Sequence, residues 1–400
     1  MRVLMTSWAA ASHFRPLVPL AWALQAAGHE VRLACQPSLV PDVTAAGLHP
    51  VVTGDDIDVS GYWRGAAVAP GDRSRQEDHE RDRTLRALRM FTGVAAEISG
   101  EVVDFARDWG CDLVVYEPRA YAGLIAAELL GIPAVRHIFG VDFTYWRHER
   151  EREPLSALWA RFGLGDVDPH GTLTVDPFPP SLQIERPLRT RTIRPVSYNG
   201  REIVPDWPAG GRPRVCVTWG TTFARSAGHL RPLMTVLDGL RDLPVTVVAA
   251  VSAEQSSLLG AVPANVRIVR SMPLSLLLPV CDAIVHQGGP GTALAAVNSG
   301  IPQLLIPSIG DQPLCAGQVA AAGAGRVIPF DALTAERVRK ETAELLGCAR
   351  HAEAAELLRR EAQAQPAPRR LWTRCGSWPG AEAGAGFGGV VDALREPAGR

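Results

Sequence analysis

The residues best suited to chemistry lie in one short stretch, 284–292, and in an acid–amide pair further along the chain. The stretch reads Ile-Val-His-Gln-Gly-Gly-Pro-Gly-Thr, and the pair is Asp311-Gln312. An apolar strand here runs into a glycine-rich turn and then into an Ala- and Leu-rich helix. The first N–H groups of a helix are unpaired and its dipole is positive there, so the turn predicts an anion site. A diphosphate is the anion we expect.

A second glycine turn, Gly220-Thr221-Thr222, follows an expected strand at 215–219. Ligands bind at the carboxyl ends of parallel strands, where both turns fall. Either turn alone could simply close a strand–helix unit. Together with Asp311 and Gln312 they favour a binding site, because an acid–amide pair suits a polyhydroxylated group.

His13 follows a small-residue turn at the end of the first expected strand and stands at a helix N-terminus. That place favours the neutral imidazole that a general base requires, although a helix cap or a surface histidine is an equal alternative. Glu117 ends the expected strand 113–116 and could orient the His13 ring. A carboxylate at a helix N-terminus is the alternative for Glu117.

The sequence gives little indication of a metal-binding site. Two Asp-x-Asp triplets, 56–58 and 166–168, could hold Mg²⁺ or Mn²⁺, but neither follows a convincing buried strand, so we interpret both as acidic loops. His137, His148 and His170 lack metal-ligand spacing. The seven cysteines form no C-x-x-C pair, which indicates a reducing compartment and no metal cluster.

Composition and charge limit the domain organisation and the classes of function that this chain can have. The 400 residues are 46% hydrophobic and carry a net charge of -1, which suits two core-forming domains and gives no basic field for nucleic acid. No signal peptide and no membrane-length apolar segment is evident. We expect a soluble, cytoplasmic protein.

Strand and helix signals alternate along the first half. Strands are expected at 3–6, 31–35, 50–52, 113–116 and 134–139, and helices at 15–27, 39–46, 84–109 and 121–130. Residues 55–83 are charged and glycine-rich and predict a loop. This alternation predicts a parallel, doubly wound sheet.

The alternation stops over 177–214, which is rich in Pro and Arg, and restarts at 215. Strands are expected at 215–219, 245–250, 266–269, 283–286, 303–306 and 325–328, with helices between them. We predict an α/β protein of two Rossmann-like domains facing across a cleft. The boundaries are 1–195 for the first domain, 196–213 for a linker, 214–350 for the second domain and 351–400 for an atypical tail.

The chain resembles the GT-B glycosyltransferases of family one, in the actinobacterial branch that attaches deoxysugars to polyketides. The similarity covers most of residues 1–350. It rests on the run from His13 to Leu24 and on the glycine turn with its acid–amide pair, 286–312. Shorter matches are Asp-Pro at 176–177, Pro-Pro-Ser at 179–181, Tyr-Asn-Gly at 198–200 and Val-Pro-Asp-Trp at 204–207.

The resemblance implies a role for each matching residue. His13 would deprotonate the acceptor hydroxyl with Glu117 in support, Met272 would meet the nucleobase, and Asp311 and Gln312 would meet the sugar. The donor diphosphate would lie against Thr221, His286, Gly288, Gly289, Gly291 and Thr292. The implied reaction inverts the anomeric carbon and uses a dTDP-sugar co-substrate, with no metal and no other cofactor.

The implied acceptor is an aglycone bound in the first domain, and a flat aromatic polyketide is favoured over a macrolide. Its pocket would be lined by Trp8, Phe14, Met90, Phe91, Phe143 and Tyr145, with Tyr62, Trp63 and Trp146 nearby, although most of these could instead be core residues. The partners implied are therefore an aglycone and a nucleotide sugar. The resemblance leaves open a P450-like activator protein and a homodimer, and it implies neither nucleic acid nor a membrane span.

Three features depart from the family pattern. Gln287 stands where many relatives have a second His, and Pro290 stands where many have Ala. From Pro366 on, the sequence lacks an apolar face, so we expect poor order or abnormal packing there. Two alternatives therefore stay open beside the O-glycosyltransferase: a nucleotide-sugar-binding subunit with weak turnover, and a C-glycosyltransferase acting on a phenolic aglycone. An epimerase would need further acids near the sugar, and no matching set is seen.

Overall fold

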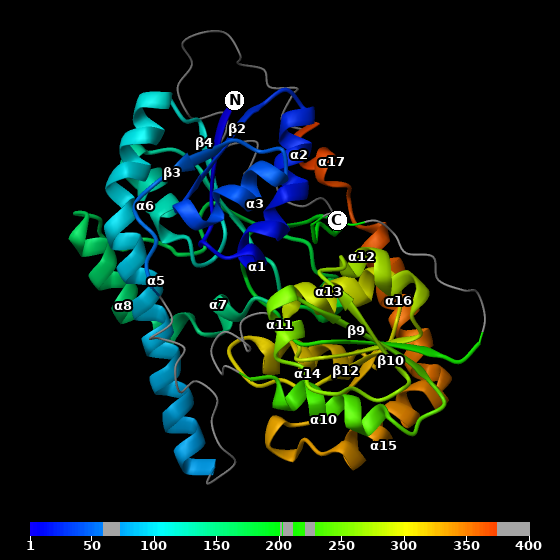
Figure 1. Ribbon diagram of the computed structural model, residues 1–400. Coiled ribbons are helices and arrows are strands. Elements are labelled where there is room, and N and C mark those ends of the chain that lie inside the picture. The colour runs from blue at the N-terminus through cyan, green and yellow to red at the C-terminus, as the bar shows by residue number, and fades with distance from the viewer. Residues whose placement is uncertain (59–72, 201, 203–210, 221–228, 374–400) are drawn as a thin grey trace.

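The protein consists of two α/β domains, seen in a computed structural model in which the chain's two halves form separate sheets (Figure 1). The structure describes residues 1–58, 73–200, 202, 211–220 and 229–373, with the backbone alone for 73–83, 372 and 373. Tyr62, Trp63 and Thr221 lie outside the described residues.

Within the described residues, the first domain holds a seven-stranded parallel sheet in the order β3-β2-β1-β4-β5-β6-β7. Its strands are β1 (Arg2–Thr6), β2 (Glu30–Cys35), β3 (Pro50–Val52), β4 (Leu113–Tyr116), β5 (Ala134–His137), β6 (Leu173–Asp176) and β7 (Thr190–Thr192). Its helices are α1 (Ala11–Phe14), α2 (Val18–Ala26), α3 (Val40–Ala45), α5 (Arg73–Trp109), α6 (Tyr121–Leu130), α7 (Phe143–Trp146) and α8 (His148–Arg161).

The described part of the second domain holds a six-stranded parallel sheet in the order β10-β9-β8-β11-β12-β13. Its strands are β8 (Arg214–Thr218), β9 (Thr246–Val251), β10 (Val266–Arg270), β11 (Ala283–His286), β12 (Gln303–Leu305) and β13 (Gly325–Val327). Its helices are α10 (Arg231–Leu240), α11 (Ala253–Ser257), α12 (Leu274–Leu277), α13 (Pro290–Ser299), α14 (Gln312–Ala321), α15 (Ala335–Gly347) and α16 (Ala349–Ala364).

The predicted fold is confirmed. In both sheets the strand order reverses beside the first strand of the domain, between β1 and β4 and between β8 and β11. That reversal opens a crevice at the carboxyl ends of the strands, where ligands bind in such sheets. The four chemical segments of the sequence follow these strands: His13 comes after β1, Glu117 after β4, Gly220 after β8 and His286 at the end of β11.

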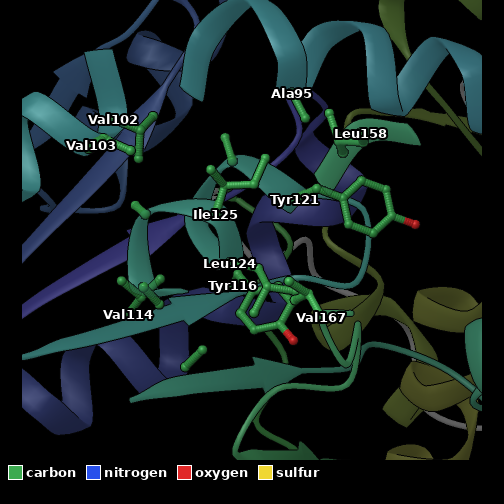
Figure 2. Close-up of a cluster of buried hydrophobic side chains, with 14 of the residues drawn as sticks. Ala95, Val102, Val103, Val114, Tyr116, Tyr121, Leu124, Ile125, Leu158 and Val167 are labelled. Carbon is green, nitrogen blue, oxygen red and sulfur yellow. The ribbon is translucent and has the colours of Figure 1, made fainter. Parts of the chain in front are cut away.

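The strands at these positions are mostly apolar because helices cover both faces of the sheet. Every residue of β4 and of β11 is buried. Figure 2 shows side chains of β4, such as Val114 and Tyr116, among apolar side chains of α5, α6 and α8. This packing holds the end of β4, and with it Glu117, in a fixed place.

The structure corrects the expected elements at two places in the first domain. Helix α5 begins at Arg73, so the predicted loop 55–83 is shorter than expected and the helix that follows it is longer. Strands β6 and β7 were not foreseen. β7 falls inside the Pro- and Arg-rich segment and was missed because it is only three residues long.

The C-terminal segment also differs from expectation. Helix α16 buries Ala355, Leu358 and Ala362 in a core shared with α13. Helix α17 (Pro368–Thr373) then lies against α2, and Leu371 packs on the core of the first domain (Figure 1). The expectation of abnormal packing after Pro366 is therefore wrong for 366–373, and residues 374–400 lie outside the described part of the chain.

Candidate active site

A cavity of about 150 Å³ lies between the two domains. The first domain contributes His13, Phe91 and Arg119 together with the loop 138–144, and the second contributes the loop 309–311. The structure thus brings His13 and Asp311, predicted from distant parts of the sequence, to the walls of one cavity.

Glu117 stands directly behind His13. Nδ1 of His13 lies 3.1 Å from Oε2 of Glu117, without the alignment of a hydrogen bond. Glu117 is fully buried, and its carboxylate accepts from the backbone N–H groups of Trp8 (3.1 Å) and Arg119 (2.9 Å). Two backbone donors therefore fix the carboxylate, which in turn faces the inner nitrogen of the imidazole and leaves the other nitrogen for the cavity.

Arg119 is a cavity residue that the sequence reasoning missed. Its guanidinium donates to both carboxylate oxygens of Glu151, at 2.6 and 2.8 Å, and to the hydroxyl of Tyr121 at 2.7 Å. Burial lowers the pKa of Arg119, but the charge of Glu151 outweighs it, so the pKa is raised overall. The position of Arg119, two residues after Glu117 at the same sheet edge, was the available signal.

A second buried pair, also missed, holds the loop 138–144. Arg136 of β5 donates to Asp142 at 2.6 Å and to the Thr174 hydroxyl at 3.0 Å. Burial raises the pKa of Asp142, but Arg136 and Arg186 outweigh it, so its pKa is lowered overall. An arginine inside an otherwise buried strand demands a partner, and this was the signal that could have pointed to the pair.

His286 ends β11 on the donor side, and the structure corrects the expected role of its side chain. The ring is fully buried: Nδ1 accepts from the Gly288 N–H at 3.1 Å, and Nε2 lies 2.9 Å from Oε1 of Gln303. Burial lowers the pKa of His286 to about 4, and the bond to Gln303 opposes that shift only in part. The neutral ring shapes the turn and offers no charge to a diphosphate.

The glycine turn itself is built as the sequence predicts. Gly288 has φ +86°, a left-handed conformation that favours glycine, and Gly289 caps α13. Pro290 at the first helical position has no N–H, so the backbone donors near the helix start come from Gly289, Gly291 and Thr292. Thr292 already donates its N–H to the Gly289 carbonyl at 3.0 Å, whereas its hydroxyl is half-buried.

Gln287 fills the space between the two glycine turns. Its side chain is 7% exposed, and its Oε1 is buried with no partner among the described residues. A Cβ added at Gly220 would lie 2.3 Å from Nε2 of Gln287, and one added at Gly289 would lie 2.8 Å from it. A side chain at either glycine would therefore require the end of the Gln287 side chain to shift.

Asp311 and Gln312 behave differently from each other. Asp311 is half-buried and lines the cavity; burial raises its pKa, and a hydrogen bond from its own backbone N–H and the charges of Arg119 and Arg147 oppose that rise in part. The Gln312 side chain is buried, and its Oε1 accepts from the N–H groups of Ser308 (3.0 Å) and Ile309 (3.2 Å). The prediction that Gln312 contacts the sugar is therefore wrong for Oε1, because this oxygen already caps the loop beside Asp311.

Met272 follows β10 at the same edge of the second sheet. It is partly buried against the core around Leu277 and Leu278. The preceding Ser271 has φ +54°, the one positive φ outside glycine among the described residues. This turn fixes the direction of the Met272 backbone, which is the group that the resemblance implies for the nucleobase.

The predicted acceptor pocket is only partly assembled. Phe91 and Phe143 line the cavity. Phe14 and Met90 are buried in the two cores of the first domain, so these two predictions are wrong. The remaining aromatics lie beside the cavity: Trp8 packs edge-on against Phe91, Tyr145 stacks on His148, and Trp146 is 54% exposed.

The described residues contain no group of three or more His, Cys, Asp or Glu side chains that could hold a metal ion. In the acidic triplets, Asp56 accepts from the Ser38 N–H and Asp168 lies 2.7 Å from Nδ1 of His170. No helix in the described part of the chain is both long and apolar enough to cross a membrane.

Comparison with known proteins shows the family of this chain. Family models described as erythromycin biosynthesis protein CIII-like match residues 22–220 with the N-terminal domain and 234–377 with the C-terminal domain. The 10-deoxymethynolide desosaminyltransferase of Streptomyces venezuelae is 36% identical over 92% of this chain and 95% of that protein. The chain belongs to the erythromycin biosynthesis protein CIII-like glycosyltransferases. Like its relatives in that family, it is a GT-B enzyme.

Other members of this glycosyltransferase family show how far the similarity extends. The TDP-daunosamine transferase of Streptomyces peucetius is 35% identical over 92% of this chain and 94% of that protein. The solved spinosyn rhamnosyltransferase has a TM-score of 0.82 at 32% identity, covering 94% of this chain and all of that one. A solved complex of the same transferase contains thymidine diphosphate, and another contains the spinosyn aglycone. Deoxysugar transfer to polyketides in antibiotic biosynthesis is thus the shared activity of the relatives.

Proposed function

We propose that this glycosyltransferase moves a deoxysugar from a TDP-sugar to a hydroxyl of a polyketide aglycone, with inversion at the anomeric carbon and without a metal ion. The observation that carries the proposal is the shared cavity, in which His13 backed by Glu117 faces Asp311 from the other domain. A base on one domain and a sugar-binding acid on the other is what a direct displacement between two bound substrates needs.

The acceptor half of the reaction follows from His13. The cavity-facing nitrogen of the neutral ring removes the proton of the acceptor hydroxyl as its oxygen attacks the anomeric carbon. The new oxygen–carbon bond forms while the bond from that carbon to the diphosphate breaks. The buried carboxylate of Glu117 stabilises the imidazolium that results and keeps the ring in place.

The donor half follows from the glycine turn. The N–H groups of Gly289 and Gly291 and the hydroxyl of Thr292 lie at the positive end of α13, where the charge of the leaving diphosphate is stabilised. Thr221 would add its hydroxyl from the neighbouring turn. His286 and Gly288 shape this turn, the Met272 backbone would meet the base, and Asp311 would hold the sugar hydroxyls.

A thermal-shift titration with TDP, UDP, GDP and NAD tests the donor assignment. A ligand at 100 times its Kd stabilises the folded state by about 2.7 kcal/mol, so a selective shift with TDP is expected. A cooperatively melting sample that shifts with none of the four would contradict the donor site. Turnover with a TDP-deoxysugar is then followed in EDTA, and the anomeric configuration of the product tests inversion.

A further inference from the structure

Aromatic side chains line the part of the cavity next to the His13 ring. The Phe139 ring centroid lies 4.8 Å from that of His13, and the Phe91 centroid lies 6.2 Å from it on a separate element. Phe139 is half-buried, and both phenylalanines line the cavity. The hydroxyl that His13 deprotonates therefore sits beside aromatic surfaces.

Further from His13, two guanidinium groups alternate with two aromatic rings. Arg119 lies over Phe91 at 5.4 Å and over Phe143 at 4.9 Å from the ring centroids, and Arg147 lies over Phe143 at 5.0 Å. All four residues line the cavity. We call this set, Phe91, Arg119, Phe143 and Arg147, the cation–π wall.

Contacts behind the cation–π wall hold its members in place. The bidentate bond of Arg119 to Glu151 fixes the plane of its guanidinium, and Arg147 donates to the Thr84 hydroxyl at 2.6 Å. Both arginines are at most 6% exposed. Their planes are thus set before a ligand arrives, and an acceptor that stacks on this wall loses little freedom of the protein.

We propose that the acceptor site selects flat, conjugated phenolic aglycones over saturated macrolactones. The inference rests on the proposed function, which makes this cavity the acceptor site. Two cations lie over the Phe143 ring within about 5 Å and draw on its π electrons, so the edge of this half-buried ring becomes more positive and packs best against the face of an electron-rich phenolic ring. A saturated macrolactone has no π face and gains only ordinary apolar contact from the same wall.

Equilibrium binding to the full-length protein with saturating TDP tests the selection. The two probes are 1,2-dihydroxyanthraquinone, which is flat and phenolic, and erythronolide B, which is a saturated macrolactone. We expect the anthraquinone to bind roughly tenfold more tightly, the combined effect of two or three stacking contacts. Equal or tighter binding of erythronolide B, or binding of neither probe to protein that binds TDP, would overturn the inference.

Two phenylalanine-to-leucine variants of the first domain sharpen the test. Phe143→Leu removes the ring between the guanidiniums and should reduce the anthraquinone preference to about twofold. Phe105→Leu is the matched control, because Phe105 stacks on Trp109 in the first domain and does not line the cavity, and it should keep the full preference. A preference that survives in Phe143→Leu would place the selectivity elsewhere and contradict the role of the wall.

The TDP thermal shift keeps the two proposals separate. Protein that binds TDP and transfers sugar to a macrolactone in preference to a phenol would retain the proposed function and refute this inference. Protein that shows no TDP shift would refute the donor assignment on which both depend. Melting curves of both variants confirm that any loss of binding comes from folded protein.

Discussion

The two halves of the active site are built from different chemistry. On the donor side, buried neutral groups dominate: His286 lies beside Gln303, and Gln287 and Gln312 fill the turns around the helix start. On the acceptor side, buried charged pairs dominate, including Arg119 with Glu151 and Arg136 with Asp142. The central strands follow the same order in both sheets, yet one side of the site is built from buried neutral groups and the other from buried charged pairs.

The difference follows from what each side has to do. Backbone N–H groups at a helix start can hold a diphosphate without a fixed counter-charge, and neutral amides support such a turn at little desolvation cost. In the proposed reaction the acceptor side moves a proton, and it also has to hold a loop, 138–144, against a sheet edge. Paired charges do both, provided that each buried charge keeps its partner.

The largest expected effect separates proton transfer from donor binding. His13→Gln removes the base, so kcat should fall about 10²- to 10⁴-fold, while TDP affinity should stay unchanged because the donor turn lies in the other domain. Steady-state kinetics and a TDP titration measure the two quantities. His49→Gln at an exposed position is the control. A full kcat in His13→Gln would contradict the assignment of the base.

The next effect tests the charged pairs of the acceptor side. Asp142→Ala leaves the buried Arg136 without its partner and should lower the free energy of unfolding by about 3–5 kcal/mol. Urea unfolding measures the change. Asp104→Ala breaks the exposed pair with Arg107 and should cost far less. Similar losses in both variants would show that burial of the Arg136–Asp142 pair does not matter.

A third effect tests the contact between the two halves. A Cβ added at Gly140 would lie 2.7 Å from Cβ of Pro290, so Gly140→Ala should push the acceptor loop away from the start of α13. We expect kcat/KM to fall about 10- to 100-fold, because small displacements of bound reactants cost that much. Gly165→Ala is the control, since a Cβ there meets nothing within 4 Å. Pro290→Gly in the Gly140→Ala chain should restore part of the loss.

The smallest effect compares how the two domains respond to acid. Burial lowers the pKa of His137 in the first domain and of His286 in the second from 6.5 to about 4. The unfolded chain therefore binds protons that the folded chain does not, and the stability from each neutral ring is full above pH 6.5 and is lost as pH falls toward 4. Between pH 7 and 5 each ring should account for a loss of about 1–2 kcal/mol.

Urea unfolding at the two pH values checks this prediction. His137→Gln and His286→Gln should each lose part of the acid sensitivity of the whole protein, whereas His49→Gln should lose none. An unchanged pH dependence in His286→Gln would mean that folding does not lower the pKa of its ring, which would reopen a direct role for the protonated ring at the diphosphate.

Much of the donor side could be predicted because its parts are close in sequence. The turn 286–292 and the pair Asp311-Gln312 follow adjacent strands, β11 and β12, so strand order alone brings them together. The directions in which the side chains of this region point could not be predicted. The His286 ring turns inward to Gln303 and Gly288, and Gln312 turns to its own loop, because each buried polar atom takes the nearest available partner.

The acceptor side was less predictable, since its cavity-lining residues come from four separate segments of the first domain. His13 and Glu117 were predicted from the ends of β1 and β4, which pair in the sheet. Phe14 and Met90 were wrongly assigned to the pocket because a helix has an inner and a cavity face, and composition does not say which face a residue takes. Arg119 and Arg136 depend on partners that no local pattern reveals.

The sequence by itself determined the two doubly wound sheets, the glycine turn at a helix start and the histidine after the first strand, because periodicity, glycine positions and strand ends are local properties. Tertiary structure alone decided that His286 is neutral and buried, that the segment 366–373 packs on the first domain, and that Arg119 and Arg147 flank Phe143. Burial and long-range pairing are properties of the packed chain, and they set both the charge of a residue and the surface that it presents.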